Sequence, residues 1–268
     1  MAIEFEKNTL QKRLKSMLAV DFRRMFTSPL FYIMLAISLV IPILILVMTT
    51  MMDGTISVNP QTGEETVFEG FANVWQMLGA ISGGESAAMA MDITSMCNIN
   101  MMFFIFAVFV TIFVSDDFRS GYAKNLFTVR AKKDDYIISK TISTFVAGVS
   151  FIFAFFVGAM LGGAIANLPF TLEGVSAGNI VLCLLSKMFL VGIFAALYVL
   201  ASVVAKQRLW MSILIALGVG MLFYTMVPII TPLNSGAMNL ILCAAGSAIF
   251  AYGIGVGSYF VLKKTDIV

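Results

Sequence analysis

Six long apolar stretches recur along the chain, and the polar connections between them hold nearly all of its charge. Each stretch exceeds 18 residues, and a helix needs about twenty mostly apolar residues to span a membrane. Lys187 is the only charged side chain within the six stretches. The pattern predicts transmembrane helices at 30–52, 94–114, 141–166, 179–204, 209–230 and 237–262.

Ahead of the first span, residues 8–26 place apolar side chains on one face of a helix and basic side chains on the remainder. The apolar face would hold Leu10, Leu14, Met17, Leu18, Phe22 and Met25. This pattern is typical of a helix that lies in the inner membrane interface. A helix that packs elsewhere outside the membrane would show the same pattern, so both interpretations stand.

The basic residues are distributed very unevenly between the connections. Sixteen of the 17 Lys and Arg residues lie before the first span, within 115–140, between the fourth and fifth spans, or after the sixth. The connections at 53–93, 167–178 and 231–236 hold none, and the first two carry seven acids. Connections rich in Lys and Arg stay in the cytoplasm. Both termini and the 115–140 region are therefore predicted to be cytoplasmic, and 53–93 is predicted to be an extracellular loop.

The predicted fold class is thus an all-α, polytopic membrane protein with six transmembrane helices and a leading interfacial helix, in one domain over residues 1–268. Composition agrees, because 60% of the residues are hydrophobic and only 12% are charged, against about a quarter in soluble domains. The net charge of +2 and the lack of a long basic tract give no indication of nucleic-acid binding.

Several functional classes lack the residues that they need. The chain has no histidine, and its predicted spans contain no carboxylate for proton- or sodium-driven transport. No intramembrane protease site, ring of channel charges or GxxxxGK[ST] phosphate loop is present. We therefore expect no catalytic residue, no metal site and no cofactor bound directly by this chain, so that any energy source must lie on a partner.

Lys187 and the cysteines each admit two interpretations. Lys187 lies near the outer end of the fourth predicted span, where snorkelling to the outer interface would accommodate it. Contact with an anionic group of a substrate is the alternative. Cys97, Cys183 and Cys243 fit small buried residues, and a disulfide between Cys97 and Cys183 is the alternative.

The predicted outer loop divides into two parts. Its first part, GTISVNPQTGEE, predicts turns or a short hairpin. Its second part places Phe68, Phe71, Ala72, Trp75 and Leu78 on one face of a short helix. Phe68, Phe71 and Trp75 could form an outer gate over a substrate exit, or the segment could be a passive cap on the bundle.

Residues 115–140, SDDFRSGYAKNLFTVRAKKDDYIISK, hold ten of the 32 charged residues. Basic residues alone would suffice to fix the topology of a solvated loop. The interleaved Tyr122, Leu126, Phe127 and Val129 instead favour a short helix that docks a cytosolic partner.

The segment from Asp117 to Leu126, followed by Lys133 and Lys140, resembles the signature of ABC-2 type exporter permeases. The Lys124-Asn125-Leu126 step is most similar to the bacitracin-resistance and lantibiotic-immunity branch, although Asp117 stands where Glu is usual. The ending YFVLKKTDI also resembles the closing residues of that family. Six spans, a leading amphipathic helix and cytoplasmic termini match along the whole length.

The resemblance implies a permease subunit in a bacterial plasma membrane, paired with a second copy or a paralogue and with two copies of a cytosolic ABC ATPase. ATP and Mg²⁺ would bind to the ATPase, so this chain would not be an enzyme. The substrate would be an amphipathic peptide or another hydrophobic compound. A non-transporting sensor, immunity or anchor protein is the alternative.

The same resemblance assigns the contacts with the ATPase. Lys206 and Arg208 would form a second, minor cytoplasmic contact. The main docking residues, on a coupling helix at about 117–130, would be Asp117, Arg119, Gly121, Tyr122, Lys124, Asn125, Leu126 and Phe127.

Overall fold

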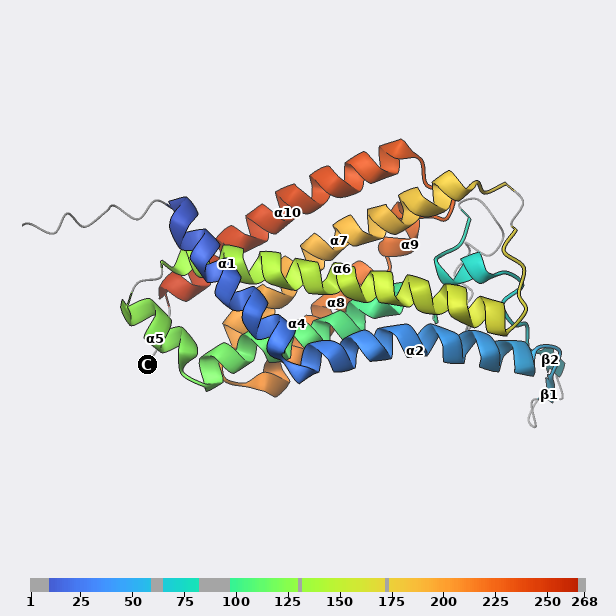
Figure 1. The fold of residues 1–268 in the computed structure, drawn as a ribbon, viewed down its shortest axis with the longest axis horizontal. Helices are drawn as coiled ribbons and strands as arrows, with labels where there is room; N and C mark the ends of the chain where they lie inside the picture. The colour runs from blue at the N-terminus through green and yellow to red at the C-terminus, as the bar shows by residue number, and fades with distance from the viewer. Residues whose placement is uncertain (1–9, 59–64, 82–96, 130–131, 172–173, 265–268) are drawn as a thin grey trace, which may run out of the picture.

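A computed structural model describes residues 10–58, 65–81, 97–129, 132–171 and 174–264 of the chain as a bundle of long helices (Figure 1). In this part of the chain, five helices are long and apolar enough to cross a membrane: α2 (Pro29–Met52), α4 (Met102–Arg119, continuing the 3₁₀ turn η3, Ile99–Met101), α6 (Lys133–Ile165), α7 (Ala177–Ala205) and α10 (Ala237–Lys264). These helices confirm the prediction of a helical, multi-pass membrane protein.

The fifth predicted span, 209–230, is interrupted. It consists of α8 (Leu209–Tyr224) and a separate turn, α9 (Val227–Ile230), and α8 alone is too short to count among the five long helices. Pro228 explains the interruption, because its ring clashes with the carbonyl four residues earlier, at Tyr224, and it has no N–H to donate. The predicted count of six full spans is therefore not established.

Two helices extend well beyond their predicted apolar limits. The predicted spans 94–114 and 141–166 become helices that end at Arg119 and begin at Lys133, respectively, while residues 94–96 lie outside the described chain. Both extensions carry charged side chains into the bundle. Asp117 and Lys140 are fully buried there, which is possible because they form ion pairs.

The two ends of the bundle differ in structure (Figure 1). At the α5 end lie the amphipathic helix α1 (Leu10–Thr27), the short helix α5 (Tyr122–Val129) and the end of α10. At the hairpin end lie the antiparallel strands β1 (Ile56–Val58) and β2 (Glu65–Val67). The strands confirm the predicted hairpin, and burial of Met17 and Met25 confirms the apolar face of α1.

The helix predicted after the hairpin is wrong in extent. Only the 3₁₀ turn η1 (Val74–Met77) forms. Residues 68–70 continue the hairpin instead, because Phe68 N–H donates to Thr55 O at 2.9 Å and Gly70 N–H donates to Asp53 Oδ1 at 2.9 Å. Asn73 then caps the turn by accepting from Trp75 N–H.

Small residues allow α2 and α6 to pack closely. A Cβ at Gly158 would lie only 2.2 Å from Leu39 O, and one at Gly162 would lie 2.8 Å from Ile43 Cα. Any larger side chain would therefore push α6 away from α2. Gly253 and Gly257 on α10 have no neighbour within 4 Å of a Cβ in the described chain, so they take no part in such packing.

Candidate functional site

Helix α5 is attached to the rest of the bundle through its apolar side chains. Its buried Ala123 and its half-buried Leu126 and Phe127 pack toward the bundle, and the Phe127 ring meets the Tyr136 ring of α6 at a centroid distance of 5.4 Å. Lys124 and Asn125 are exposed. The apolar residues of α5 therefore hold it on its own bundle, and the surface left for a partner is polar.

A glycine makes the turn between α4 and α5. Gly121 adopts φ +74°, and no atom lies within 4 Å of the position that a Cβ would occupy. Other residues are strained in this left-handed region of the backbone, although there is space for a side chain. Glycine at this position thus sets the direction in which α5 leaves α4.

Beneath α5, three buried charged residues and the half-buried Arg24 form a network that we call the inner ion cluster: Asp21, Arg24, Asp117 and Lys140. Lys140 Nζ lies 2.7 Å from Asp21 Oδ1 and 2.8 Å from Asp117 Oδ2. Arg24 Nη1 donates to Asp117 Oδ1 at 2.6 Å. The cluster joins α1, α4 and α6, so these three helices are expected to move together.

Neutral donors also form hydrogen bonds to the two buried carboxylates. Tyr136 Oη donates to Asp117 Oδ2 at 2.9 Å, and Ser139 Oγ donates to Asp21 Oδ2 at 2.5 Å. Burial of ionic groups is tolerable when hydrogen bonds satisfy their remaining lone pairs. A separate ion pair, Arg13 Nε to Asp135 Oδ2 at 2.9 Å, also ties α1 to α6.

Aromatic rings surround the two cations of the cluster. The Arg24 guanidinium lies 4.3 Å from the centre of the Tyr122 ring, and Lys140 Nζ lies 4.3 Å from that of Phe113. Burial lowers the pKa of Arg24, but the charge of Asp117, the hydrogen bond to it and the smaller effects of Tyr122 and Asp21 together outweigh burial, so the pKa is raised overall. Burial, with the nearby Asp21 carboxylate, raises the pKa of the Tyr122 phenol. Tyr122 is therefore a neutral ring beside a permanent cation, which favours a cation–π contact.

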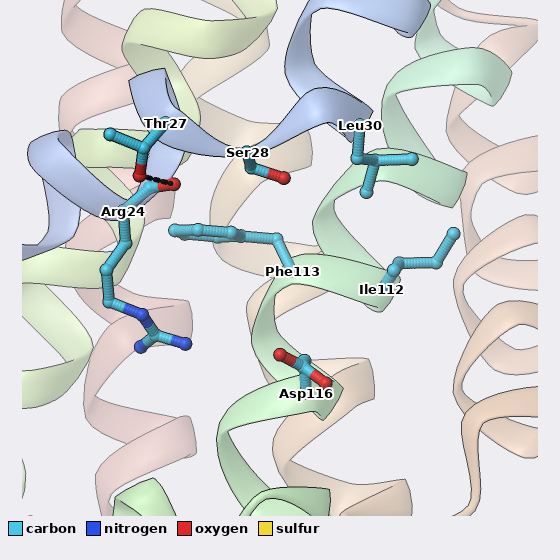
Figure 2. Close-up of a pocket in the computed structure, with 7 residues that line it drawn as sticks. All are labelled: Arg24, Thr27, Ser28, Leu30, Ile112, Phe113 and Asp116. Carbon is cyan, nitrogen blue, oxygen red and sulfur yellow. Dashed lines mark hydrogen bonds between the residues drawn. The ribbon is translucent and has the colours of Figure 1, made fainter.

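A groove of about 360 Å³ opens beside the cluster, where α1 joins α2 and faces α4 (Figure 2). Its residues are Arg24, Thr27, Ser28, Leu30, Ile112, Phe113 and Asp116. Thr27 Oγ1 donates to the Arg24 carbonyl at 3.3 Å, which closes the end of α1 (Figure 2). The groove exposes Asp116, whereas its neighbour Asp117 points into the bundle.

The structure separates the predicted docking residues into two groups. Arg119, Lys124 and Asn125 are exposed and can reach a partner. Asp117 is fully buried in the inner ion cluster, and half-buried Tyr122, Leu126 and Phe127 contact the same chain. Val129 ends α5, and nothing is described of its side chain.

The second predicted contact, between α7 and α8, lies at the same end of the bundle (Figure 1). Lys206 is half-buried with φ +52°, and Arg208 is exposed. Their role in binding a partner stays a prediction.

The predicted gate residues at the hairpin end are packed together. Phe71 is buried. Trp75 Nε1 donates to Phe170 O at 2.6 Å, and its ring also meets the Phe170 ring. Phe68 is half-buried and continues the hairpin. This arrangement favours the passive cap over a freely moving gate.

The expectation that Lys187 snorkels to the interface is wrong. Lys187 is fully buried, and its Nζ donates to Asn100 Oδ1 at 2.8 Å and to Thr231 Oγ1 at 2.9 Å. Helix α7 packs beside α4, and the link after α9 brings Thr231 over it, so the ammonium has polar partners without reaching the interface. Cys97, Cys183 and Cys243 are free thiols, as expected for small packed residues.

Sequence reasoning missed most of the inner ion cluster. Asp21 is the one acid in an otherwise basic α1, and Tyr136, Ser139 and Lys140 recur at the three- and four-residue spacing of a single helix face. An acid that interrupts a basic face, and a polar face on an apolar helix, are signals that could have indicated buried pairing.

Comparison with known proteins gives one match. The family model described as ABC-2 family transporter protein matches residues 18–228, a range that holds the inner ion cluster and α5. No curated protein matches the chain, and no solved structure does. The bacitracin-type branch stays a prediction.

Proposed function

Because this chain belongs to the ABC-2 family of transporter proteins, we propose that it is the permease subunit of an ATP-driven exporter and that α5 docks the ATPase. The family is the membrane component of ABC transporters, in which a separate subunit carries the ATPase activity. The permease would act as a pair, either two copies or one copy with a paralogue, and each would bind one ATPase subunit.

The observation that carries this proposal is the division of α5 into two faces. One face is fixed to the bundle by Ala123, Leu126 and Phe127, and the opposite face offers Lys124 and Asn125 to the surroundings. A short helix with no role in spanning the membrane, yet held firmly at its base, suits the transfer of force from a partner.

The inner ion cluster provides a path for that force. A push on α5 acts on α4 and α6, on which it rests, and the ion pairs of Asp117 and Lys140 carry the displacement to α1. We therefore assign Arg119, Lys124 and Asn125 to contact with the ATPase, and Asp117 and Tyr122 to positioning. Lys206 and Arg208 would supply the minor second contact.

The substrate would be amphipathic or hydrophobic, such as a peptide. Large apolar side chains are exposed along α2, α8 and α10, among them Leu44, Leu214 and Ile249. Such faces suit contact with lipid tails, and a compound that enters from the membrane would meet charge-free helix surfaces.

The test is purification of the tagged protein from its native membranes in mild detergent, with and without light cross-linking, followed by mass spectrometry. We expect a cytosolic ATPase with a phosphate-loop sequence in equal amount. Lys124→Glu should reduce its recovery about tenfold, the size of effect that reversal of one rim charge can have. The matched control is Lys264→Glu, also exposed at the α5 end, which should leave recovery unchanged.

Two outcomes would contradict the proposal. Recovery of the permease alone, even after cross-linking, would favour the sensor or anchor alternative. Equal losses in the two variants would show that net charge, rather than the outer face of α5, governs binding.

A further inference from the structure

The surroundings of Lys187 at the hairpin end form a compact polar site inside an apolar bundle. Three segments meet at its ammonium: Asn100 from η3 at the start of α4, Lys187 itself from α7, and Thr231 from the link after α9. All three side chains are fully buried. We call them the Lys187 site.

The bonding of this site is incomplete. A lysine ammonium has three donors and no acceptor, and two neutral oxygens accept from it here. No ion pair to Lys187 exists among the residues that the structure describes. Asn100 Nδ2, also buried, has no hydrogen-bond partner. Lys187 Nζ and Asn100 Nδ2 can therefore each donate a further hydrogen bond, and the two side chains already bond to each other.

A lone buried ammonium is costly within a membrane protein, and such residues pair with an opposite charge or mark a functional pathway. The inner ion cluster solves the same problem with two aspartates. The Lys187 site has the cation and the additional donor of an anion-binding site, but the described chain supplies no anion.

Two non-helical connections pack next to the site. A Cβ at Gly79, in the loop after η1, would lie 3.9 Å from Lys187 Nζ and 3.8 Å from Thr231 O. The next residue joins this loop to the link after α9, because Leu233 N–H donates to Ala80 O at 2.8 Å. These two connections therefore lie close to the ammonium and are joined to each other.

We propose that Lys187, Asn100 and Thr231 bind the anionic group, a carboxylate or phosphate, of a single-chain amphiphile that the exporter carries. This inference rests on the proposed function, and it specifies the class of substrate that the exporter would carry. The anion accepts from Lys187 Nζ and Asn100 Nδ2. Thr231 Oγ1, which now donates to Val227 O at 2.7 Å, turns from that carbonyl to donate to the anion. The tail lies along the charge-free spans.

The test is direct binding to the purified full-length protein in dodecyl maltoside, a detergent that already supplies an uncharged twelve-carbon chain in excess. The probes are radiolabelled laurate and dodecyl phosphate, measured by equilibrium dialysis against protein-free micelles. We expect saturable binding of about one equivalent per chain, reduced at least tenfold in Lys187→Met. The matched control, Lys264→Met, should bind as the wild type does.

A second variant keeps the proposal testable if Lys187→Met does not fold. Asn100→Asp is isosteric and places a carboxylate within 2.8 Å of Lys187 Nζ, where Asn100 Oδ1 now lies. It should raise the melting temperature and abolish binding of both probes. A lower melting temperature with unchanged binding would show that the site is a neutral structural contact, and would overturn the proposal.

Two further arms separate the possible sources of the anion. Inorganic phosphate should not compete at concentrations a hundredfold above those of the probes, because it lacks the tail. If phosphatidylglycerol displaces the probes at lower concentrations than laurate does, the occupant is a bilayer headgroup and the cargo assignment fails. None of these measurements uses the ATPase, so loss of the exporter proposal and loss of the anion site would be observed separately.

Discussion

Each end of the bundle buries one lysine, and the two are held in opposite ways. Lys140 at the α5 end contacts two carboxylates, Asp21 and Asp117. Lys187 at the hairpin end contacts only a neutral amide and a hydroxyl. In the first arrangement the cation has its counter-charges within the described chain, which suits a part that transmits force without changing. The second lacks a counter-charge, which suits a part that exchanges partners.

The largest expected effect comes from replacing Lys140 by methionine, and the same change at Lys187 should have a smaller effect. Lys140→Met leaves two aspartates buried without a counter-charge, and should lower the free energy of unfolding by about 3–5 kcal/mol. Lys187→Met removes a cation that has no counter-charge in the described chain but leaves the buried Asn100 Oδ1 without its donor, so it should cost about 1–3 kcal/mol. Thermal unfolding in detergent, with Ile138→Met on the exposed side of α6 as the control, measures the difference. If both variants lose the same free energy of unfolding, the proposed difference between the two buried lysines is wrong.

A smaller effect is expected from Asp117→Asn, which keeps the shape of the side chain and removes its charge. It weakens the bonds to Arg24 and Lys140, and should cost about 1–3 kcal/mol. Amide hydrogen exchange over residues 17–27 should become faster, because α1 loses a main attachment. ATP-driven transport should fall more than ATPase binding.

The neighbouring Asp116→Asn is the control for that comparison, since Asp116 is exposed and lines the groove in Figure 2. It should leave the exchange of α1 unchanged. If the two variants behave alike, the inner ion cluster does not hold α1, and the proposed path from α5 to α1 is lost.

The smallest effect concerns the turn into α5. Gly121→Ala places a Cβ on a residue with φ +74°, and should cost about 1–2 kcal/mol. Gly54 at the hairpin end has φ +76° and equally open space, so Gly54→Ala should have the same cost. Only the Gly121 variant should reduce recovery of the ATPase. Equal recovery from both variants would show that the direction of α5 is unimportant for docking.

The sequence predicts best where one physical preference dominates. Hydropathy located the apolar part of every long helix, and the 3.6-residue period identified the apolar face of α1. The hairpin followed from its turn residues. These features depend on local composition, which neighbouring elements did not overturn.

Prediction from the sequence failed where contacts with residues far away in the sequence determine whether a charged side chain is buried or exposed. The apolar spans predicted within α4 and α6 exclude Asp117 and Lys140, because a hydropathy pattern treats charged residues as boundaries, whereas their mutual pairing allows both to be buried in the bundle. Lys187 was placed at the interface because Asn100 and Thr231 lie 87 and 44 residues away along the chain. The end of α8 could have been predicted from the sequence, because Pro228 breaks the helix at the preceding turn.

The apolar residues of α5 are predicted to dock a partner, and in the structure they contact this chain's own bundle. Leu126 and Phe127 pack on this chain's own core. Sequence cannot show which surface an amphipathic helix covers, because a bundle and a partner protein attract the same side chains.

The interruption at Pro228 also has a consequence for the lipid. With a rise of about 1.5 Å per residue, the 16 residues of α8 extend only about 24 Å, against a hydrocarbon thickness of about 30 Å. Short hydrophobic segments draw the bilayer inward around them. The membrane beside α8 should therefore be locally thinner than elsewhere around the protein, so that headgroups and water approach its midplane most closely along this one side of the bundle.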